Sequence, residues 1–204
     1  IRGESMKEKA QKISKELKRD RESLYLLTND LKNANKELEY LANCDLVTDL
    51  PNRLFFMDIV QSTFKRADIA KKKVAIMFLD LDGFKAINDT LGHEAGDMIL
   101  KVVGTRLSSV VRASDTVARI GGDEFAISLG EISDIKHVEQ IAKTIIKEVN
   151  ELCNYNGKDC QVGVSIGISL YPDNGEDIES LMKKADEAMY KIKQTGKNNY
   201  AIFS

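Results

Sequence analysis

One short stretch, Ile120-Gly121-Gly122-Asp123-Glu124-Phe125, lies between two runs, 116–120 and 125–129, that have the composition of β-strands. Two adjacent glycines between such runs predict a β-hairpin, because glycine adopts positive φ at little cost. The hairpin would present two carboxylates at its tip, where the missing Cβ atoms let a phosphate or a metal ion approach the backbone. Most Gly-Gly-Asp turns, however, are only acidic turns exposed to solvent. Its function therefore depends on what the rest of the chain brings there.

The composition is that of a soluble globular protein. Of 204 residues, 43% are hydrophobic and 30% are charged, so the chain can bury a normal core. A net charge of −2 gives no overall basicity and argues against nucleic acid as a partner. There is no signal-peptide pattern and no apolar run of membrane-spanning length. The scattered Cys44, Cys153 and Cys160 fit neither a disulfide framework nor a zinc site, which predicts a reducing cytosol, although Cys153 and Cys160 could pair in principle.

Residues 1–44 carry a heptad repeat. Its two rows are Leu17, Leu24, Leu31, Leu38 and Ile13, Asp20, Leu27, Ala34, Leu41. These are the a and d positions of a coiled coil, and the narrow apolar stripe favours a two-stranded seam over a helix that folds back on its own domain. We therefore predict a dimerising helix over 1–44 and a separate domain over 45–204. The chain begins with Ile1, so we expect it to be a fragment whose upstream sensor module is absent.

A short apolar run, 74–79, predicts a central strand that is buried on both faces. Asp80 and Asp82 follow it. Carboxylates at the end of a rigid strand can hold a divalent metal, and hard oxygen ligands suit Mg²⁺. Asp82 could instead cap the next helix, whereas Asp80 follows six apolar residues and needs a partner.

Helix and strand patterns fill the rest of the domain. Helices are predicted at about 52–66, from 84 to Gly92, across Glu94 to 110, at 134–152 and at 177–196, and strands at 161–170 and 200–203. The first helix is expected to bury Leu54, Phe55, Ile59, Val60 and Phe64, and the fourth to bury Leu152. This order predicts an α+β sandwich with helices on one face of a mostly antiparallel sheet.

Polar residues gather at two helix ends. Asn88, His93 and Asp97 surround the junction of the two middle helices, where an amide and a carboxylate together could read the edge of a guanine. Turn and cap roles are the simpler interpretation on spacing alone. Lys193 and Lys197 flank the end of the last helix, where pairing with the helix dipole is an alternative to phosphate binding.

From about residue 45 to 204 the chain resembles the GGDEF domain of bacterial diguanylate cyclases. The matching motifs occur in the family's order at 45–53, 78–89, 92–97, 121–125, 164–169, 185–190 and 196–198. The resemblance implies a ferredoxin-like palm related to that of nucleotidyl cyclases, with a mixed, mostly antiparallel sheet and flanking helices, preceded here by the coiled-coil helix. It also implies a homodimer that condenses two GTP into cyclic di-GMP and two pyrophosphates, with the two active sites facing each other.

The resemblance further assigns roles to residues. Asp80 and Asp123 would bind two Mg²⁺ per active site, with Mn²⁺ as an alternative, helped by the carbonyl of Leu81 and by Glu124. The catalytic and GTP-binding residues would be Lys85 on the reacting phosphates, Asn88, His93 and Asp97 around guanine, Gly121 and Gly122 beside the phosphates, and Lys193 and Lys197 on the terminal phosphates. Asp123 could take the proton of the 3′-hydroxyl directly or act only as a metal ligand.

Arg112 and Asp115 match the family's RxxD site, at which cyclic di-GMP would inhibit the enzyme. An exposed Arg–Asp pair of little energetic value is the alternative. The family's second arginine has no counterpart on helix 134–152, which offers only lysines. A catalytically silent cyclic di-GMP receptor and a plain dimerisation module are competing hypotheses, but the complete signature and Asp80 favour the enzyme. We expect a cytoplasmic domain, whose parent protein could be attached to a membrane.

Overall fold

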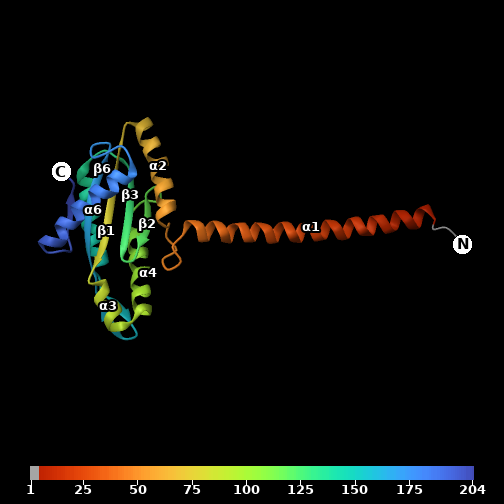
Figure 1. Cartoon of the computed structure of the whole chain (residues 1–204), viewed down its shortest axis with the longest axis horizontal. Helices are drawn as coiled ribbons and strands as arrows, with labels where there is room; N and C mark the ends of the chain where they lie inside the picture. Colours follow the sequence, from red (N-terminus) through yellow and green to blue (C-terminus); the bar gives the residue numbers. More distant parts are fainter. Residues whose placement is uncertain (1–4) are drawn as a thin grey trace. The chain divides into compact units, whose positions relative to one another are not determined.

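A computed structural model describes residues 5–204, apart from the side chains of Lys7 and Ile13. The chain divides into one compact unit that ends at Ala42 and a second that runs from Asn43 to Ser204 (Figure 1). No helix in the described part of the chain combines the length and apolar character needed to cross a membrane.

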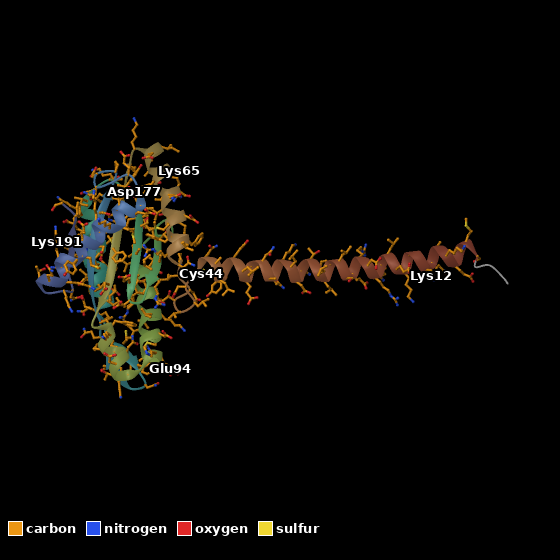
Figure 2. All side chains as sticks on the ribbon, in the orientation of Figure 1. Lys12, Cys44, Lys65, Glu94, Asp177 and Lys191 are labelled. Atoms are coloured by element: carbon orange, nitrogen blue, oxygen red, sulfur yellow. The ribbon has the colours of Figure 1, made fainter. Side chains whose placement is uncertain are left out.

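The first unit is a single long helix, α1, Met6–Asn43. Side chains project from it along its whole length (Figure 2). The heptad leucines at 17, 24, 27, 31, 38 and 41 are between 51% and 65% exposed. The predicted helix is therefore confirmed, and its apolar seam is open to a partner. Pairing of two such helices stays a prediction, and the side chain of Ile13 lies outside the described residues.

The second unit is built on a five-stranded sheet with the order β2-β3-β1-β6-β7. The strands are β1 Lys73–Asp82, β2 Thr116–Gly121, β3 Glu124–Ile132, β6 Gly163–Tyr171 and β7 Tyr200–Ile202. Strand β1 is antiparallel to both β3 and β6, and β7 pairs in parallel with β6. The predicted mixed, mostly antiparallel sheet with a central β1 is thus confirmed.

Five helices cover this sheet. They are α2 Arg53–Ala70, α3 Phe84–Leu91, α4 His93–Val110, α5 Ile135–Val149 and α6 Ile178–Thr195. Side chains of β1 alternate between the two faces: Met77 and Leu79 lie in the core formed with α3, α4 and α5, whereas Ile76 and Phe78 pack with α2 and α6. The prediction of helices on one face is therefore wrong. A continuously apolar central strand requires cover on both sides.

The buried face of α2 also differs from the prediction. Leu54 is 73% exposed, whereas Phe56 is fully buried. The reason is the start of the helix at Arg53, where Asn52 Oδ1 accepts a hydrogen bond from the Phe55 N–H at 3.0 Å. This cap fixes the rotation of the helix and turns Leu54 away from the sheet. Similarly, α5 ends at Val149, so Leu152 lies outside the helix and is 60% exposed.

A short hairpin precedes β6 and was not predicted. It consists of β4, Cys153–Tyr155, and β5, Lys158–Cys160. The turn residues Asn156 and Gly157 have φ values of 50° and 80°. An Asn-Gly pair is a strong signal for a two-residue hairpin turn, but the strands are too short to show an alternating pattern.

Candidate active site

The glycine-rich stretch forms the predicted hairpin between β2 and β3. Gly121 and Gly122 have positive φ values of 157° and 53°, and a Cβ at either position would meet only open space. The Leu81 N–H donates to the carbonyl of Asp123 at 3.2 Å. The end of β1 therefore holds the hairpin tip, and the backbone of both glycines is open to a ligand.

Two predicted site carboxylates lie side by side across the sheet. Asp80 is paired directly with Glu124 in the register of β1 and β3, so the two side chains point to the same face. Asp80 is only 9% exposed. Lys193, from the end of α6, places its Nζ 2.6 Å from Asp80 Oδ2. Three elements that are distant in sequence thus converge on one point.

The charges at this point are crowded. Burial raises the pKa of Asp80, the hydrogen bond from Lys193 opposes this, and the charge of Asp123 raises the pKa further. Burial also raises the pKa of Glu124, and the charges of Asp80, Asp123 and Asp186 add to the effect. Both carboxylates are therefore costly to ionise in the folded protein, and an added cation would relieve that cost.

The donor set fits a hard divalent cation, because its side chains offer only carboxylate oxygens. Within residues 5–204, however, no group of three or more His, Cys, Asp or Glu side chains is arranged to hold a metal as it stands. The Lys193 ammonium pairs with Asp80 Oδ2, a position that a metal ion could otherwise take. A metal bound through Asp80 Oδ2 would therefore displace Lys193.

Asp82 does not cap the helix that follows it. The N-cap of α3 is Gly83, which makes no side-chain cap. Instead, Asp82 Oδ2 accepts from Ser165 Oγ at 2.8 Å and from the Asn198 N–H at 3.0 Å. Asp82 thereby joins the end of β1 to β6 and to the loop that carries Lys197.

Asn88 and Asp97, which were predicted to read guanine, do not cap a helix. The N-cap of α4 is Gly92. Asn88 Oδ1 is buried and has no hydrogen-bond partner among the described residues. A Cβ at Gly96 would collide with this same oxygen, so the glycine makes room for the amide. A buried amide oxygen requires a donor, and an N–H of a bound base would supply one. Asp97 and His93 are exposed in the first turns of α4, and Lys85 is exposed in the first turn of α3.

The predicted RxxD residues do not form an ion pair with each other. Asp115 accepts from two backbone N–H groups, Oδ2 from Arg112 and Oδ1 from Gly130, both at 3.1 Å. The Arg112 guanidinium points elsewhere, with Nη2 2.7 Å from His137 Nε2. The alternative of an exposed Arg–Asp pair is therefore wrong. Asp115 shapes the loop, and the guanidinium of Arg112 lies against His137 of α5 instead.

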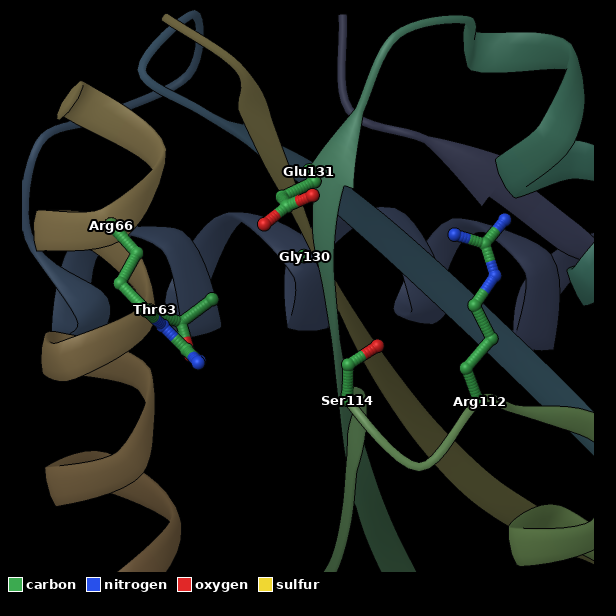
Figure 3. Close-up of a pocket in the computed structure, with 6 residues that line it drawn as sticks. All are labelled: Thr63, Arg66, Arg112, Ser114, Gly130 and Glu131. Carbon is green, nitrogen blue, oxygen red and sulfur yellow. The ribbon is translucent and has the colours of Figure 1, made fainter. Parts of the chain in front are cut away.

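A second arginine lines the same pocket as Arg112, and the sequence did not indicate that the first helix of the domain would supply it. Arg66 of α2 and Arg112 lie on opposite sides of one surface pocket (Figure 3). The pocket is lined by Thr63, Arg66, Arg112, Ser114, Gly130 and Glu131. Arg66 is held by a hydrogen bond from its Nη2 to Thr63 Oγ1 at 3.1 Å. No local pattern marks Arg66, because its role follows only from the packing of α2 beside β2 and β3.

Residues 42–199 match the family described as diguanylate cyclase, GGDEF domain. The chain belongs to the GGDEF family. It is 39% identical over 178 residues to the bifunctional diguanylate cyclase/cyclic di-GMP phosphodiesterase MucR of Pseudomonas aeruginosa, which covers 87% of this chain and 26% of MucR. The chain thus spans about a quarter of the length of such curated relatives.

Solved GGDEF domains share the fold. The GGDEF domain of TpbB from Pseudomonas aeruginosa has a TM-score of 0.76 at 35% identity, covering 79% of this chain and 94% of that one. The coiled coil and GGDEF domain of DgcB from Caulobacter crescentus, solved with c-di-GMP, has a TM-score of 0.83 at 26% identity, covering 91% and 98%. The family places this chain in cyclic di-GMP metabolism.

The GGDEF hairpin has a further support that was not predicted, Arg119 of β2. Its Nη1 donates to both carboxylate oxygens of Asp45, at 2.9 and 3.1 Å. Its Nε and Nη2 donate to the carbonyl of Gly122, at 3.0 and 2.8 Å. One guanidinium therefore links the loop that follows α1 to the turn of the GGDEF hairpin. The planar fork of arginine suits such a double role.

Proposed function

We propose that this GGDEF domain is a diguanylate cyclase that condenses two GTP into cyclic di-GMP and two pyrophosphates. The observation that carries the proposal is the convergence of Asp80, Glu124 and Lys193 beside the open Gly121-Gly122 backbone. This arrangement brings together carboxylates that can bind a metal ion, a lysine that can pair with a phosphate, and a backbone that a ligand can approach. Phosphoryl transfer needs these three elements.

The residues divide the work as follows. Asp80, Asp123 and Glu124, with the carbonyl of Leu81, hold divalent cations, Mg²⁺ or Mn²⁺. Bound cations would lower the pKa of the attacking 3′-hydroxyl and offset charge on the phosphates. Lys193, which is paired with Asp80 here, would be available to a phosphate oxygen of the nucleotide once a metal ion neutralised Asp80.

The nucleotide is positioned by groups on α3, α4 and the loop after α6. Asn88 Oδ1, buried and unpaired, accepts a hydrogen bond from a guanine N–H. Asp97 accepts from the same edge, and His93 lies one turn before it. Lys85 and Lys197 neutralise the phosphates.

A homodimer is required by the chemistry. Each 3′-hydroxyl must attack the α-phosphorus of the other GTP, so two active sites have to face each other. The exposed heptad leucines of α1 offer the surface on which two chains would associate.

Product inhibition is proposed at the pocket between Arg66 and Arg112. Arg66 and Arg112 line one pocket, and their two guanidinium groups would suit a ligand that carries two phosphates and two guanines once Arg112 turns from His137 toward it. Arg66 supplies the second arginine, which α5 lacks. Cyclic di-GMP bound there would hold the domain in an arrangement in which active sites do not meet.

The proposal is tested by incubating the protein with GTP and Mg²⁺ at several protein concentrations. Cyclic di-GMP should form, and the rate should rise faster than linearly with concentration while dimers assemble. Asp123→Asn should abolish turnover, whereas Asp89→Asn, a change of an exposed acid on α3, should not. Binding of cyclic di-GMP without any turnover would instead support the receptor module.

A further inference from the structure

The β4–β5 hairpin places two cysteines directly opposite each other. Its register pairs Cys153 with Cys160, Asn154 with Asp159 and Tyr155 with Lys158. Directly opposed residues of an antiparallel pair point to the same face. Accordingly, both cysteines are buried in the core formed with α4 and α5, with 8% and 5% of their surface exposed. Two thiols thus lie together beneath a hairpin at the surface.

The backbone geometry permits a bond between them. Opposed Cα atoms in an antiparallel pair are about 4.5–5.5 Å apart, within the range of about 4.4–6.8 Å found across disulfides. The Cβ atoms would have to approach by up to about 1 Å. A pair of strands with three residues each can make that adjustment. The resulting bond would be somewhat strained, and strained disulfides are the readily reduced ones.

The two thiols have no stronger partners to lose. Cys153 Sγ lies 3.8 Å from the carbonyl of Glu151, and Cys160 Sγ lies 3.6 Å from that of Lys158. A thiol is a weak donor, so these contacts oppose oxidation little. The third cysteine, Cys44, lies in the loop after α1, where it forms a β-bridge with Pro51.

Hydrogen bonds made by residues on either side of Cys153 hold the hairpin against α4. Arg106 of α4 donates to the carbonyls of Glu151 and Leu152, at 2.7 and 3.1 Å. Tyr155 Oη donates at 3.4 Å to Oε2 of Glu94, which lies on the first turn of α4. Across the two strands, Asn154 Nδ2 donates to Asp159 Oδ1 at 2.9 Å, so a brief opening of the strand ends would expose the thiols without separating them.

We propose that Cys153 and Cys160 are a reversible oxidation site that forms an intramolecular disulfide with a small-molecule disulfide as the oxidant. One thiolate attacks the oxidant, forms a mixed disulfide and releases the first small thiol. The second thiolate then attacks the protein sulfur of that mixed disulfide and releases the second small thiol. Two electrons and two protons pass from the cysteines to the oxidant, which leaves as two thiols.

The chain provides a direct assay, because Lys158 lies between the two cysteines. After alkylation of free thiols, trypsin separates Cys153 on peptide 148–158 from Cys160 on peptide 159–183. The whole protein is equilibrated with defined ratios of oxidised and reduced glutathione. The expected product is these two peptides joined, with free thiols falling from three to one and restored by dithiothreitol. Amide hydrogen exchange in residues 154–159 should slow in the oxidised form.

Single serine variants separate the proposal from its alternatives. Cys44→Ser should form the linked peptide as wild type does. Cys153→Ser should form none and should keep glutathione on Cys160 as a mixed disulfide. A link from either cysteine to Cys44 or to a second chain would overturn the proposal. The proposal would also be overturned if peptides 148–158 and 159–183 stayed unlinked at a glutathione ratio that already converts Cys44 to its mixed disulfide.

Discussion

Replacing Arg119 with alanine tests how the GGDEF hairpin is held. The guanidinium makes two hydrogen bonds to Asp45 and two to the carbonyl of Gly122. The side chains of Arg119 and Asp45 are only 12% and 23% exposed. The variant therefore leaves a partly buried carboxylate without its cation and releases the turn of the hairpin.

The loss of stability expected for Arg119→Ala follows from these contacts. Removing one partner of a buried ion pair costs about 3–5 kcal/mol. Asp45 keeps hydrogen bonds from the Thr48 N–H and Oγ1, at 2.9 and 2.8 Å, which places the loss at the lower end. About 3 kcal/mol corresponds to a fall in Tm of about 6–12 °C for a domain of this size. Arg119→Lys should lose about half as much, because one ammonium cannot reach both Asp45 and Gly122.

The pH dependence identifies the ion pair as the cause. Burial raises the pKa of Asp45, but hydrogen bonds from Arg119 and Thr48 outweigh it, and the net pKa is lowered. A lowered pKa contributes stability above the unfolded-state value, about 4, and that stability is lost as the pH falls through the folded-state value. The Tm difference between wild type and Arg119→Ala should therefore shrink below about pH 4.

Thermal unfolding from pH 3 to pH 8 measures this difference, and amide hydrogen exchange at 121–123 reports the hairpin turn. Exchange there should be faster in the variant, because the carbonyl of Gly122 loses both donors. A Tm difference that stays constant from pH 8 to pH 3 would refute the ion-pair argument. If the variant unfolds within about 2 °C of wild type at pH 7, the expected loss of about 3 kcal/mol in stability is refuted.

Three further substitutions test other parts of the domain. Glu124→Gln should raise the Tm of the metal-free protein, since it removes a carboxylate that burial and the charges of Asp80 and Asp123 make costly to ionise, and should abolish both turnover and the stabilisation by Mg²⁺ seen in thermal scans. Gly96→Ala should raise the KM for GTP about tenfold or more, because its Cβ displaces Asn88 Oδ1; an unchanged KM would exclude Asn88 from guanine binding. Arg66→Ala should keep the initial rate and weaken inhibition by added cyclic di-GMP at least tenfold, whereas the neighbouring Lys65→Ala should leave inhibition unchanged.

Much of the fold could be predicted because its signals are local. The apolar run at 74–79 predicted the central strand, and the Gly-Gly pair predicted the hairpin. The helix starts predicted at 134 and 177 are correct, because Asp134 and Asp177 each accept a backbone N–H of the first turn, from Lys136 and Ser180. Errors arose where the outcome depended on packing, as in the choice between Leu54 and Phe56 for the buried face of α2.

The candidate site divides in the same way. Asp80 and Glu124 are conspicuous in the sequence, yet nothing local shows that they are neighbours. Arg66 and Arg112 are 46 residues apart, and only the packing of α2 places them at one pocket. The role of Arg119 could not be predicted, because no sequence pattern near it indicates its partners, the carboxylate of Asp45 and the carbonyl of Gly122.

The register of β1 and β3 explains how such a site is specified. Glu124 lies opposite Asp80 only because Leu79 lies opposite Phe125 and Met77 opposite Ile127 in the core. A slip of one residue would turn every side chain of one strand to the other face and separate the two carboxylates. That slip would also carry Phe125 and Ile127, both fully buried, out of the core shared with α3, α4 and α5. The apolar pairs therefore determine the geometry of the acidic site, and a substitution among them should impair turnover without contacting any substrate.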